Sequence, residues 1–373
     1  MLKRIYNSNS HDTHQTKDMR LITSLCEDVF SVLRLHLDTI QIFLNKKSDT
    51  FTMTVCLMFS QLRLKQIQFR GKFLKSLETC CAAANDFQRM GEQCERVVDD
   101  FRDHVSEDSL KLLEESCSTL VSLFTRDAVF AAQVAYKYIY EPIWDTIADE
   151  LFGTTWEKEL TYNELALKLT KTLDDFIADV KVFLDKFLLQ KVMKALILAS
   201  VIFYVECLLF RSALHKSKKD ASFINSALAI ERMEGDIKVL RDYFNGFVGD
   251  MPALGQVIET EFQVITAILE LLRIAIGVSD SNASDFIVVL HRKVKDVKIT
   301  KWVLGDLWHL VKPKKEKEIV KSIKLLTRSL VAVCPHESSS STSENTDVQS
   351  LCLHKSLATF YDQSKRKRIV RWR

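Results

Sequence analysis

Few residues in this sequence have the types and the spacing that metal binding would need. The closest are two Cys-x-His units, Cys334-Pro-His336 and Cys352-Leu-His354. Structural zinc takes four fixed nitrogen or sulfur ligands, and its cysteines usually stand two to four residues apart. The two units instead lie on either side of a Ser-rich stretch, which would not fix their geometry. We therefore expect no metal and no cofactor.

The histidines and carboxylates are also poorly placed for catalysis. His11 and His14 lie in a polar N-terminal stretch, which gives them no fixed geometry. Neighbouring residues on a helix point about 100° apart, so adjacent acids do not face one substrate. No glycine-rich phosphate loop, H-E-x-x-H or G-x-S-x-G motif occurs. We expect no enzymatic activity and no small-molecule substrate, and we read the acidic pairs as solvated faces: Asp99/Asp100, Glu114/Glu115 and Asp174/Asp175.

The C-terminal stretch KRKRIVRWR, residues 365–373, has a composition that suits an anionic surface. Cations near anionic lipid gain about 1 kcal/mol each, and tryptophan prefers the headgroup interface. Nucleic-acid binding, nuclear import and a tail without function stay open as alternatives, with nucleic acid the less favoured partner. The candidate membrane- or anion-binding residues are Lys365, Arg366, Lys367, Arg368, Arg371, Trp372 and Arg373.

Charge is distributed unevenly along the chain. Residues 292–328 carry a net +8 and residues 351–373 a net +6, while residues 329–350 carry −3. The total of +3 leaves −8 for residues 1–291. A chain with an acidic body and a basic end is suited to contacting different partners at its two ends.

The elements that would position these residues are predicted to be helices. The 373 residues include only 9 Gly and 4 Pro, too few for the many turns of a β protein. Apolar residues recur every three or four positions, as in Leu21–Leu44, and no β-type alternation persists. The nine cysteines form no disulfide pattern, and the N-terminus has no apolar signal-peptide core. We expect reduced cysteines in a cytoplasmic chain.

Helix boundaries follow from capping and breaking residues. We expect a long helix over 50–90 with a break near Gly71, and Ser106 as the N-cap of a helix over 107–125, followed by another over 126–152. Thr161 and Glu164 form a capping box, and Ser284 or Asp285 caps a later helix. The fold class is all-α, an elongated stack of antiparallel helical bundles. The predicted parts are a flexible tail (1–18), one bundle (19–153), one or more further bundles (154–333), a disordered Ser-rich linker (334–350), and a short helix with the basic tail (351–373).

Residues 195–210, ALILASVIFYVECLLF, are apolar enough to raise the question of a membrane span. A span needs about 18–20 apolar residues, and this run has sixteen, with Glu206 inside it. A carboxylate in the bilayer costs at least a few kcal/mol. We therefore favour a helix buried at the centre of a helical stack.

A series of weak motifs between Trp144 and Phe244 occurs in a recognisable order. An apolar helix ends in Leu-Phe, followed by a Trp; a Thr-Leu-x-Asp-aromatic motif comes next, with Phe176 where Tyr is usual. A Phe-Leu pair, a helix with Tyr and two leucines, and a helix with Asp, Leu and a final aromatic complete the series. The residues concerned are Leu151, Phe152, Trp156, Thr172, Leu173, Asp175, Phe176, Tyr204, Leu208, Leu209, Asp236, Leu240 and Phe244.

This series resembles the C-terminal helical half of exocyst complex component three, the Sec-six family, and the likeness fades before 140 and after about 330. The resemblance implies a rod of helical bundles and a packing role for the motif residues. It further implies a non-enzymatic subunit of the vesicle-tethering exocyst, placed in the cytoplasm and peripherally at secretion sites on the plasma membrane. Sister exocyst subunits, SNARE proteins and small GTPases are its implied partners. Family members also carry an N-terminal coiled coil, absent from this pattern, so a fragment and a shortened relative both stay open.

A second reading stays open beside the resemblance. The chain could be a stand-alone cytosolic helical scaffold that binds anionic membrane or a signalling partner through its basic C-terminal tail.

Overall fold

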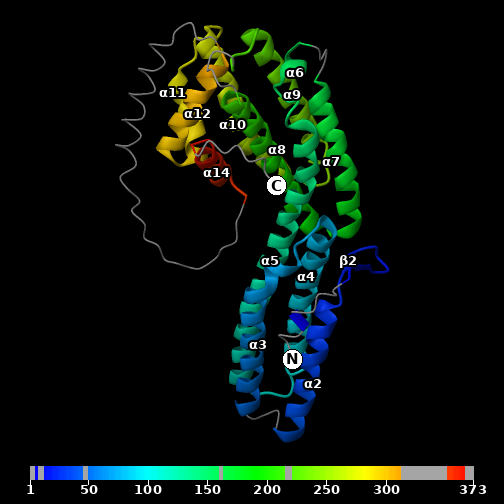
Figure 1. Cartoon of the computed structure of the whole chain (residues 1–373). Coiled ribbons are helices and arrows are strands. Elements are labelled where there is room, and N and C mark those ends of the chain that lie inside the picture. The colour runs from blue at the N-terminus through cyan, green and yellow to red at the C-terminus, as the bar shows by residue number, and fades with distance from the viewer. Residues whose placement is uncertain are drawn as a thin grey trace. The chain divides into compact units, whose positions relative to one another are not determined.

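The computed structural model describes residues 5–6, 12–44, 49–158, 163–214, 221–311 and 351–365 (Figure 1). Almost all of these residues are α-helical, which confirms the all-α prediction. Two short strands pair antiparallel near the N-terminus. The elements are β1 (His14–Gln15), β2 (Leu21–Ile22), α2 (Leu25–Phe43), α3 (Asp49–Phe69), the 3₁₀ helix η1 (Arg70–Phe73), α4 (Leu77–Asp99), α5 (Glu107–Ile147), α6 (Thr154–Lys158), α7 (Glu164–Phe183), α8 (Lys186–Leu214), α9 (Ser226–Asn245), α10 (Ala253–Ile276), α11 (Ala283–Val294), α12 (Val297–Leu310) and α14 (Leu353–Lys365).

The chain divides into two compact units. The first consists of Met1–Ile139 and Phe176–Val192, and the second of Tyr140–Asp175 and Met193–Arg373. Helices α5, α7 and α8 each contribute residues to both units. From the sequence we expect a boundary between residues 153 and 154. The two compact units are divided at other positions, and the expected boundary stays a prediction.

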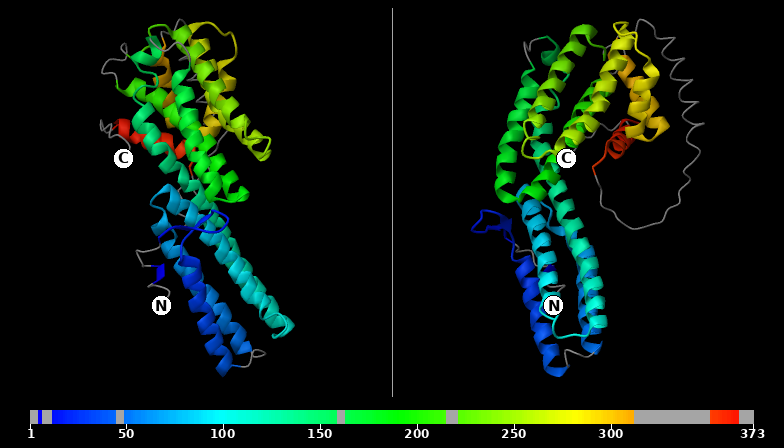
Figure 2. Two further views of the ribbon diagram at one scale, coloured as in Figure 1. Left: turned by 90° about the vertical axis from the view of Figure 1, so that its right-hand side faces the viewer. Right: turned by 180° about the vertical axis from the view of Figure 1, so that it is seen from behind.

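In the first unit, α2, α3, α4 and the early turns of α5 lie side by side (Figures 1 and 2). The short connections between consecutive helices make these neighbours antiparallel. The break expected near Gly71 is confirmed, since α3 ends at Phe69 and η1 follows. Ser76 then starts α4 by a capping box with Thr79, in which each side chain accepts the other residue's backbone N–H.

Several predicted boundaries change in the structure. The two helices expected over 107–125 and 126–152 are one helix of 41 residues, α5, with Pro142 inside it. Ser106 caps it as expected, because its Oγ accepts the Ser109 backbone N–H at 3.2 Å. Helix α11 is capped by Asn282 and not by Ser284 or Asp285, since the Asn282 side chain accepts the Ser284 N–H. An Asn side chain readily accepts the backbone N–H two residues further along the chain. Asn282 therefore caps the helix two or three residues earlier than Ser284 or Asp285 would have done.

The capping box expected at Thr161 and Glu164 lies partly outside the described residues, because Thr161 is not among them. Residues 312–350, which contain the predicted linker and the helix expected after Pro313, also lie outside them.

The N-terminal segment is anchored where the structure describes it. Tyr6, which we expected to lie in a loose tail, is buried, and its hydroxyl donates to Gln66 Oε1 at 3.1 Å. Its ring stacks on Phe69 with centroids 5.7 Å apart. His14–Gln15 pairs with Leu21–Ile22 and brings the chain back toward α2. The burial of the Tyr6 ring stabilises this segment against the first unit, although its sequence neighbours are mostly polar.

The apolar stretch that raised the question of a membrane span lies in α8. The segment Lys186–Ser212 is long and apolar enough to cross a membrane, yet 89% of an 18-residue apolar stretch within it is buried inside the protein. Within the second unit its side chains contact other helices; for example, Phe203 packs edge-on against Trp144 with centroids 4.9 Å apart. The apolar surface of this stretch is thus covered by protein, as expected for a central helix.

Candidate functional site: buried carboxylate clusters

The side chain of Asp236, on α9, is fully buried in the second unit and receives three hydrogen bonds. Its Oδ2 accepts from Trp156 Nε1, on α6, and from the Tyr204 hydroxyl, on α8, both at 3.2 Å. Its Oδ1 accepts from Asn163 Nδ2 at 2.8 Å. We call these four residues the Asp236 cluster. They come from four places in the chain and meet at one carboxylate.

Asn163 stands immediately before α7 and connects that helix to α9. Its Nδ2 also donates to the backbone oxygen of Arg232 at 2.8 Å. The approach is close enough to depend on Gly235, since a Cβ there would clash with Asn163 Oδ1. Glycine in a helix interior costs up to about 1 kcal/mol relative to alanine. Here the absent Cβ leaves room for the Asn163 amide.

Burial raises the pKa of Asp236 to about 6, because a charged carboxylate loses its hydration. The hydrogen bonds from Asn163, Trp156 and Tyr204 oppose this rise by stabilising the ionised form. Burial and the nearby carboxylate also raise the pKa of Tyr204 well above its ordinary value, so its hydroxyl stays a donor. Both oxygens of the Asp236 carboxylate therefore accept hydrogen bonds from residues of the same unit.

A buried ion pair lies beside this cluster. Arg211 Nη2, on α8, donates to Glu157 Oε2, on α6, at 2.9 Å. Arg211 Nε donates to the Ala221 backbone oxygen at 3.0 Å, and its guanidinium lies 4.2 Å over the Phe223 ring. Glu157 also accepts from the Ile224 backbone N–H. Because each charge has several partners, the pair fixes α6, α8 and the segment before α9.

Phe152 joins the ion pair to the Asp236 cluster. Its φ of 63° is left-handed, which is unusual for a residue with a Cβ. Its ring packs edge-on against Trp156 and against Tyr204, both with centroids 5.0 Å apart. Its backbone oxygen accepts a hydrogen bond from Arg211. Two ring contacts and a charged donor hold the strained conformation in place.

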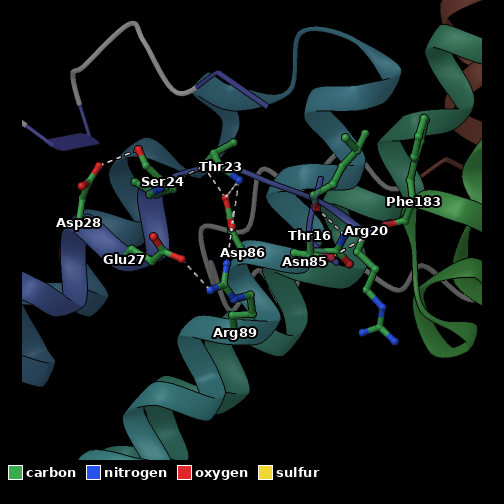
Figure 3. Close-up of polar contacts among 12 residues, drawn as sticks. Thr16, Arg20, Thr23, Ser24, Glu27, Asp28, Asn85, Asp86, Arg89 and Phe183 are labelled. Carbon is green, nitrogen blue, oxygen red and sulfur yellow. Dashed lines mark hydrogen bonds and ion pairs between the residues drawn. The ribbon is translucent and has the colours of Figure 1, made fainter. Parts of the chain in front are cut away.

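The first unit contains its own buried carboxylate, Asp86 on α4 (Figure 3). Asp86 lies between Thr23, whose backbone N–H donates to Oδ2 at 3.0 Å and whose hydroxyl donates to the same atom, and Arg89. Arg89 in turn donates to Glu27 Oε1, on α2, at 3.1 Å. Burial raises the Asp86 pKa to about 7, although the Thr23 bonds and the Arg89 charge lower it. The carboxylate thus fixes the start of α2 against α4.

The neighbouring amide, Asn85, makes a comparable connection within the first unit. Its Nδ2 donates to the backbone oxygens of Leu21, on β2, at 2.7 Å and of Phe183, at the end of α7, at 2.8 Å (Figure 3). The pair Asn85 and Asp86 therefore places β2, the start of α2 and the end of α7 around the middle of α4.

Glu206, the acid inside the apolar stretch, is buried and contacts the C-terminal helix α14. Its Oε1 accepts from the Ser356 hydroxyl. Burial raises its pKa to about 7, and the Ser356 bond opposes the rise. Leu357 and Phe360 of α14 are buried as well, and the Phe360 ring lies 5.8 Å from Trp302 on α12. The charge in α8 thus has a protein partner from the end of the chain.

These clusters have the chemistry of structural contacts. The Asp236 oxygens point at donors of the same unit, and Asp86 is arranged in the same way. Over the described residues, no group of three or more His, Cys, Asp or Glu side chains is placed to hold a metal ion. Of the two Cys-x-His units, for which we expected no metal, Cys334 and His336 lie outside the described residues, and the His354 ring contacts the Val294 backbone oxygen.

Comparison with known protein families gives a match over most of the chain. The family described as "Exocyst complex component Sec6" matches residues 4–280. The chain belongs to the Sec6 family of exocyst components. It therefore belongs to a family of non-enzymatic scaffolds of vesicle tethering in exocytosis. No curated protein sequence matches the chain by direct comparison.

The fold agrees with a solved member of the Sec6 family. The structure described as "Crystal structure of the C-terminal domain of the exocyst subunit Sec6p" superposes with a TM-score of 0.65 at 13% sequence identity. The match covers 88% of this chain and 84% of that chain. At this identity the likeness concerns the fold alone. The family match also corrects the expected extent of the resemblance, which does not fade before 140 but begins at residue 4.

The structure brings several of the Sec6-type motif residues together. Phe152, Trp156, Tyr204 and Asp236 meet in and beside the Asp236 cluster. Others are buried in the same unit: Leu151, Leu173, Leu208, Leu209, Leu240 and Phe244.

Three motif residues on α7 are placed differently. Thr172 and Phe176 are half-buried, and Asp175 is exposed, so the packing role inferred for Asp175 is wrong. Its neighbour Asp174 has a contact instead, since it accepts from the Tyr243 hydroxyl at 2.9 Å. Adjacent helix positions point in different directions, and only one of the two acids faces α9.

The predicted membrane- or anion-binding residues lie in the C-terminal stretch 365–373 of the sequence. Lys365 is the last residue of α14, and Arg366, Lys367, Arg368, Arg371, Trp372 and Arg373 lie outside the described residues.

Sequence reasoning missed Asn163, Gly235, Arg211, Glu157 and Asp86. The only local signal was a polar residue in an apolar context, as in CCAAAND for Asp86. A single sequence does not tell which distant residue will satisfy such a group.

Proposed function

We propose that the chain acts as a non-enzymatic subunit of the exocyst in exocytosis. It would bind sister subunits together with fusion machinery, including SNARE proteins and small GTPases, and hold secretory vesicles at the plasma membrane. The family match over residues 4–280 is the observation that carries the proposal. The fold shared with the C-terminal domain of Sec6p supports it.

The buried carboxylates are consistent with a scaffold. Asp86, Asp236 and Glu206 each bind donors of their own unit, so these polar groups stabilise the fold. Recognition of partners is then left to the outer faces of the helices. A scaffold of this kind works by surface area and charge rather than by a catalytic pocket.

Affinity capture tests the proposal directly. The tagged full-length chain, expressed in cells that secrete actively, should recover the other exocyst subunits in amounts comparable to one another. A charge-matched cytosolic protein with the same tag serves as the control. Capture of the chain without exocyst subunits would contradict the proposal.

The alternative, a stand-alone scaffold that binds anionic membrane, is favoured by the basic tail. Residues 351–373 carry a net +6 with Trp372 among the cations. Liposomes with about a quarter anionic lipid should sediment the chain in low salt and lose it when residues 365–373 are deleted. Sedimentation that is unchanged by the deletion would remove the tail from this alternative.

A further inference from the structure

Helix α3 has apolar side chains on two faces. One face packs into the first unit through Phe51, Val55, Phe59, Leu62 and Phe69. The other carries Met53, Leu57, Leu64 and Ile67, whose exposed fractions are 65%, 60%, 58% and 43%. Single exposed apolar residues are ordinary on protein surfaces. Four such residues along one face of one helix are less ordinary, and exposed apolar patches are typical of interaction sites.

The spacing of the exposed residues indicates that the partner covering them is a helix. Positions 53, 57, 60, 64 and 67 alternate by four and three residues, the period of a coiled-coil seam, with the exposed Ser60 in the middle. We call these five residues the α3 stripe. At 1.5 Å per residue it is about 21 Å long, which matches three to four turns of a partner helix.

The stripe continues onto the neighbouring helix at one end. The Cys56 thiol contacts the Leu112 backbone oxygen of α5 at 3.8 Å, and the Leu112 side chain is 43% exposed. The apolar surface is therefore wider there than one helix and would accept a bulky side chain of the partner.

The charges beside the stripe indicate the sign of its partner. From Thr50 to Phe69, helix α3 has no acidic residue, and its cations are Arg63 and Lys65. Arg63 is exposed and flanks Leu64. Residues 1–291 as a whole carry −8, so the α3 part of this face is basic in an acidic part of the chain, while the exposed Asp108 and Glu115 flank Leu112 on α5. Charges beside a coiled-coil seam select partners of the opposite sign.

We propose that the α3 stripe docks an amphipathic helix of another protein, with apolar residues in heptad spacing and acidic residues beside them. A second copy of this chain fits less well, because two stripes placed together would bring Arg63 side chains near each other, and α3 has no acid from Thr50 to Phe69 to neutralise them. A membrane surface also fits less well, since interfacial helices carry several Lys or Arg beside a broad apolar face. The proposal goes beyond membership of the exocyst, because it names a surface and the chemistry of its partner.

Two synthetic peptides of three heptads serve as probes. Both have leucine at the seam positions; one has glutamate and the other lysine at the flanking positions. Fluorescence anisotropy should show that the full-length chain binds the glutamate peptide more tightly. The double variant L57S/L64S should weaken this binding about tenfold or more, because it removes two central contacts. Arg63→Glu should weaken the glutamate peptide and favour the lysine peptide.

Val278→Ser is the matched control, since Val278 is 67% exposed in the second unit. It should leave binding unchanged. Circular dichroism melting of every variant checks folding, and exposed substitutions should hardly change it. Equal binding by wild type and L57S/L64S would overturn the proposal, as would indifference to peptide charge. A wild-type dimer that L57S/L64S dissociates in sedimentation equilibrium would also overturn it, in favour of self-association.

The outcome is separable from the proposed function. If the peptides fail to bind while exocyst subunits are still captured, the proposed docking at the α3 stripe is wrong and the exocyst role stands. If the glutamate peptide binds in a stripe-dependent way while no exocyst subunits are captured, the stripe stands and the exocyst role fails.

Discussion

Asp236 shows at the scale of one residue how this chain uses charge in its interior. The carboxylate has no exposed surface, and Trp156, Tyr204 and Asn163 donate to both of its oxygens. A buried acceptor with three donors is stabilising only while all partners are present, since an unpaired donor costs about 1–3 kcal/mol. The residue therefore acts as a point where α6, α7, α8 and α9 are fixed.

We predict that Asp236→Asn lowers the free energy of unfolding by about 1–3 kcal/mol. An amide replaces one accepting oxygen by a donor, which then faces the donors of Trp156 and Tyr204 or that of Asn163. Asp175→Asn on α7 is the matched control, since Asp175 is exposed. Urea unfolding followed by circular dichroism measures both. Equal stability of the two variants would show that the cluster does not support the fold.

Glu206 gives a pH-dependent prediction. Its pKa is about 7 in the fold against an ordinary 4.5, so the folded chain holds this proton more tightly than the unfolded chain. Its contribution is therefore complete below pH 4.5 and is lost as the pH rises through 7. Glu206→Gln keeps an acceptor for Ser356 and removes the titration. Its stability relative to wild type should rise between pH 5 and pH 8.

Asp86 and Asp236 also have raised pKa values, so they add a loss of stability with rising pH that wild type and Glu206→Gln share. The informative quantity is consequently the difference in melting temperature between Glu206→Gln and wild type at each pH. Glu231→Gln, at an exposed position of α9, provides the reference. A difference that stays constant from pH 5 to pH 8 would contradict the assignment of the titration to Glu206.

At the scale of elements, most helices were predictable because their signals are local. Apolar residues every three or four positions between Leu21 and Leu44 predicted α2, and Ser106 predicted the start of α5. The division of α5 into two helices was wrong, because no breaker separates 125 from 126, and Pro142 near the C-terminal end of the helix is tolerated. Contacts such as Asn163 with Asp236 join residues 73 positions apart. No pattern in a single sequence specifies such a pair.

The packing of α7 against α9 gives a prediction at this scale. Gly235→Ala alone should destabilise the second unit, because its Cβ would displace the Asn163 amide from Asp236. In an Asn163→Ala background the clash is absent, so the same change should stabilise by up to about 1 kcal/mol through helix propensity. A double-mutant cycle by chemical unfolding measures the coupling. Additive effects would mean that the two residues do not interact.

At the scale of the whole molecule, the account rests on helices that bury their apolar faces within the protein and leave their outer faces for partners. Membership of the Sec6 family agrees with this, and so does the burial of the one membrane-length stretch found among the described residues. The basic composition of residues 365–373 and the α3 stripe each suggest a partner chemistry. The α3 stripe does not belong to the buried clusters, so changes to it should leave folding intact.

The most direct test is the size at which the native chain migrates in a lysate of secreting cells. Gradient fractionation should place it in high-mass fractions with the other exocyst subunits, and immunodepletion of one such subunit should remove it from those fractions. This is the result expected of an exocyst component. Migration at the size of the isolated chain, unchanged by the depletion, would contradict the account.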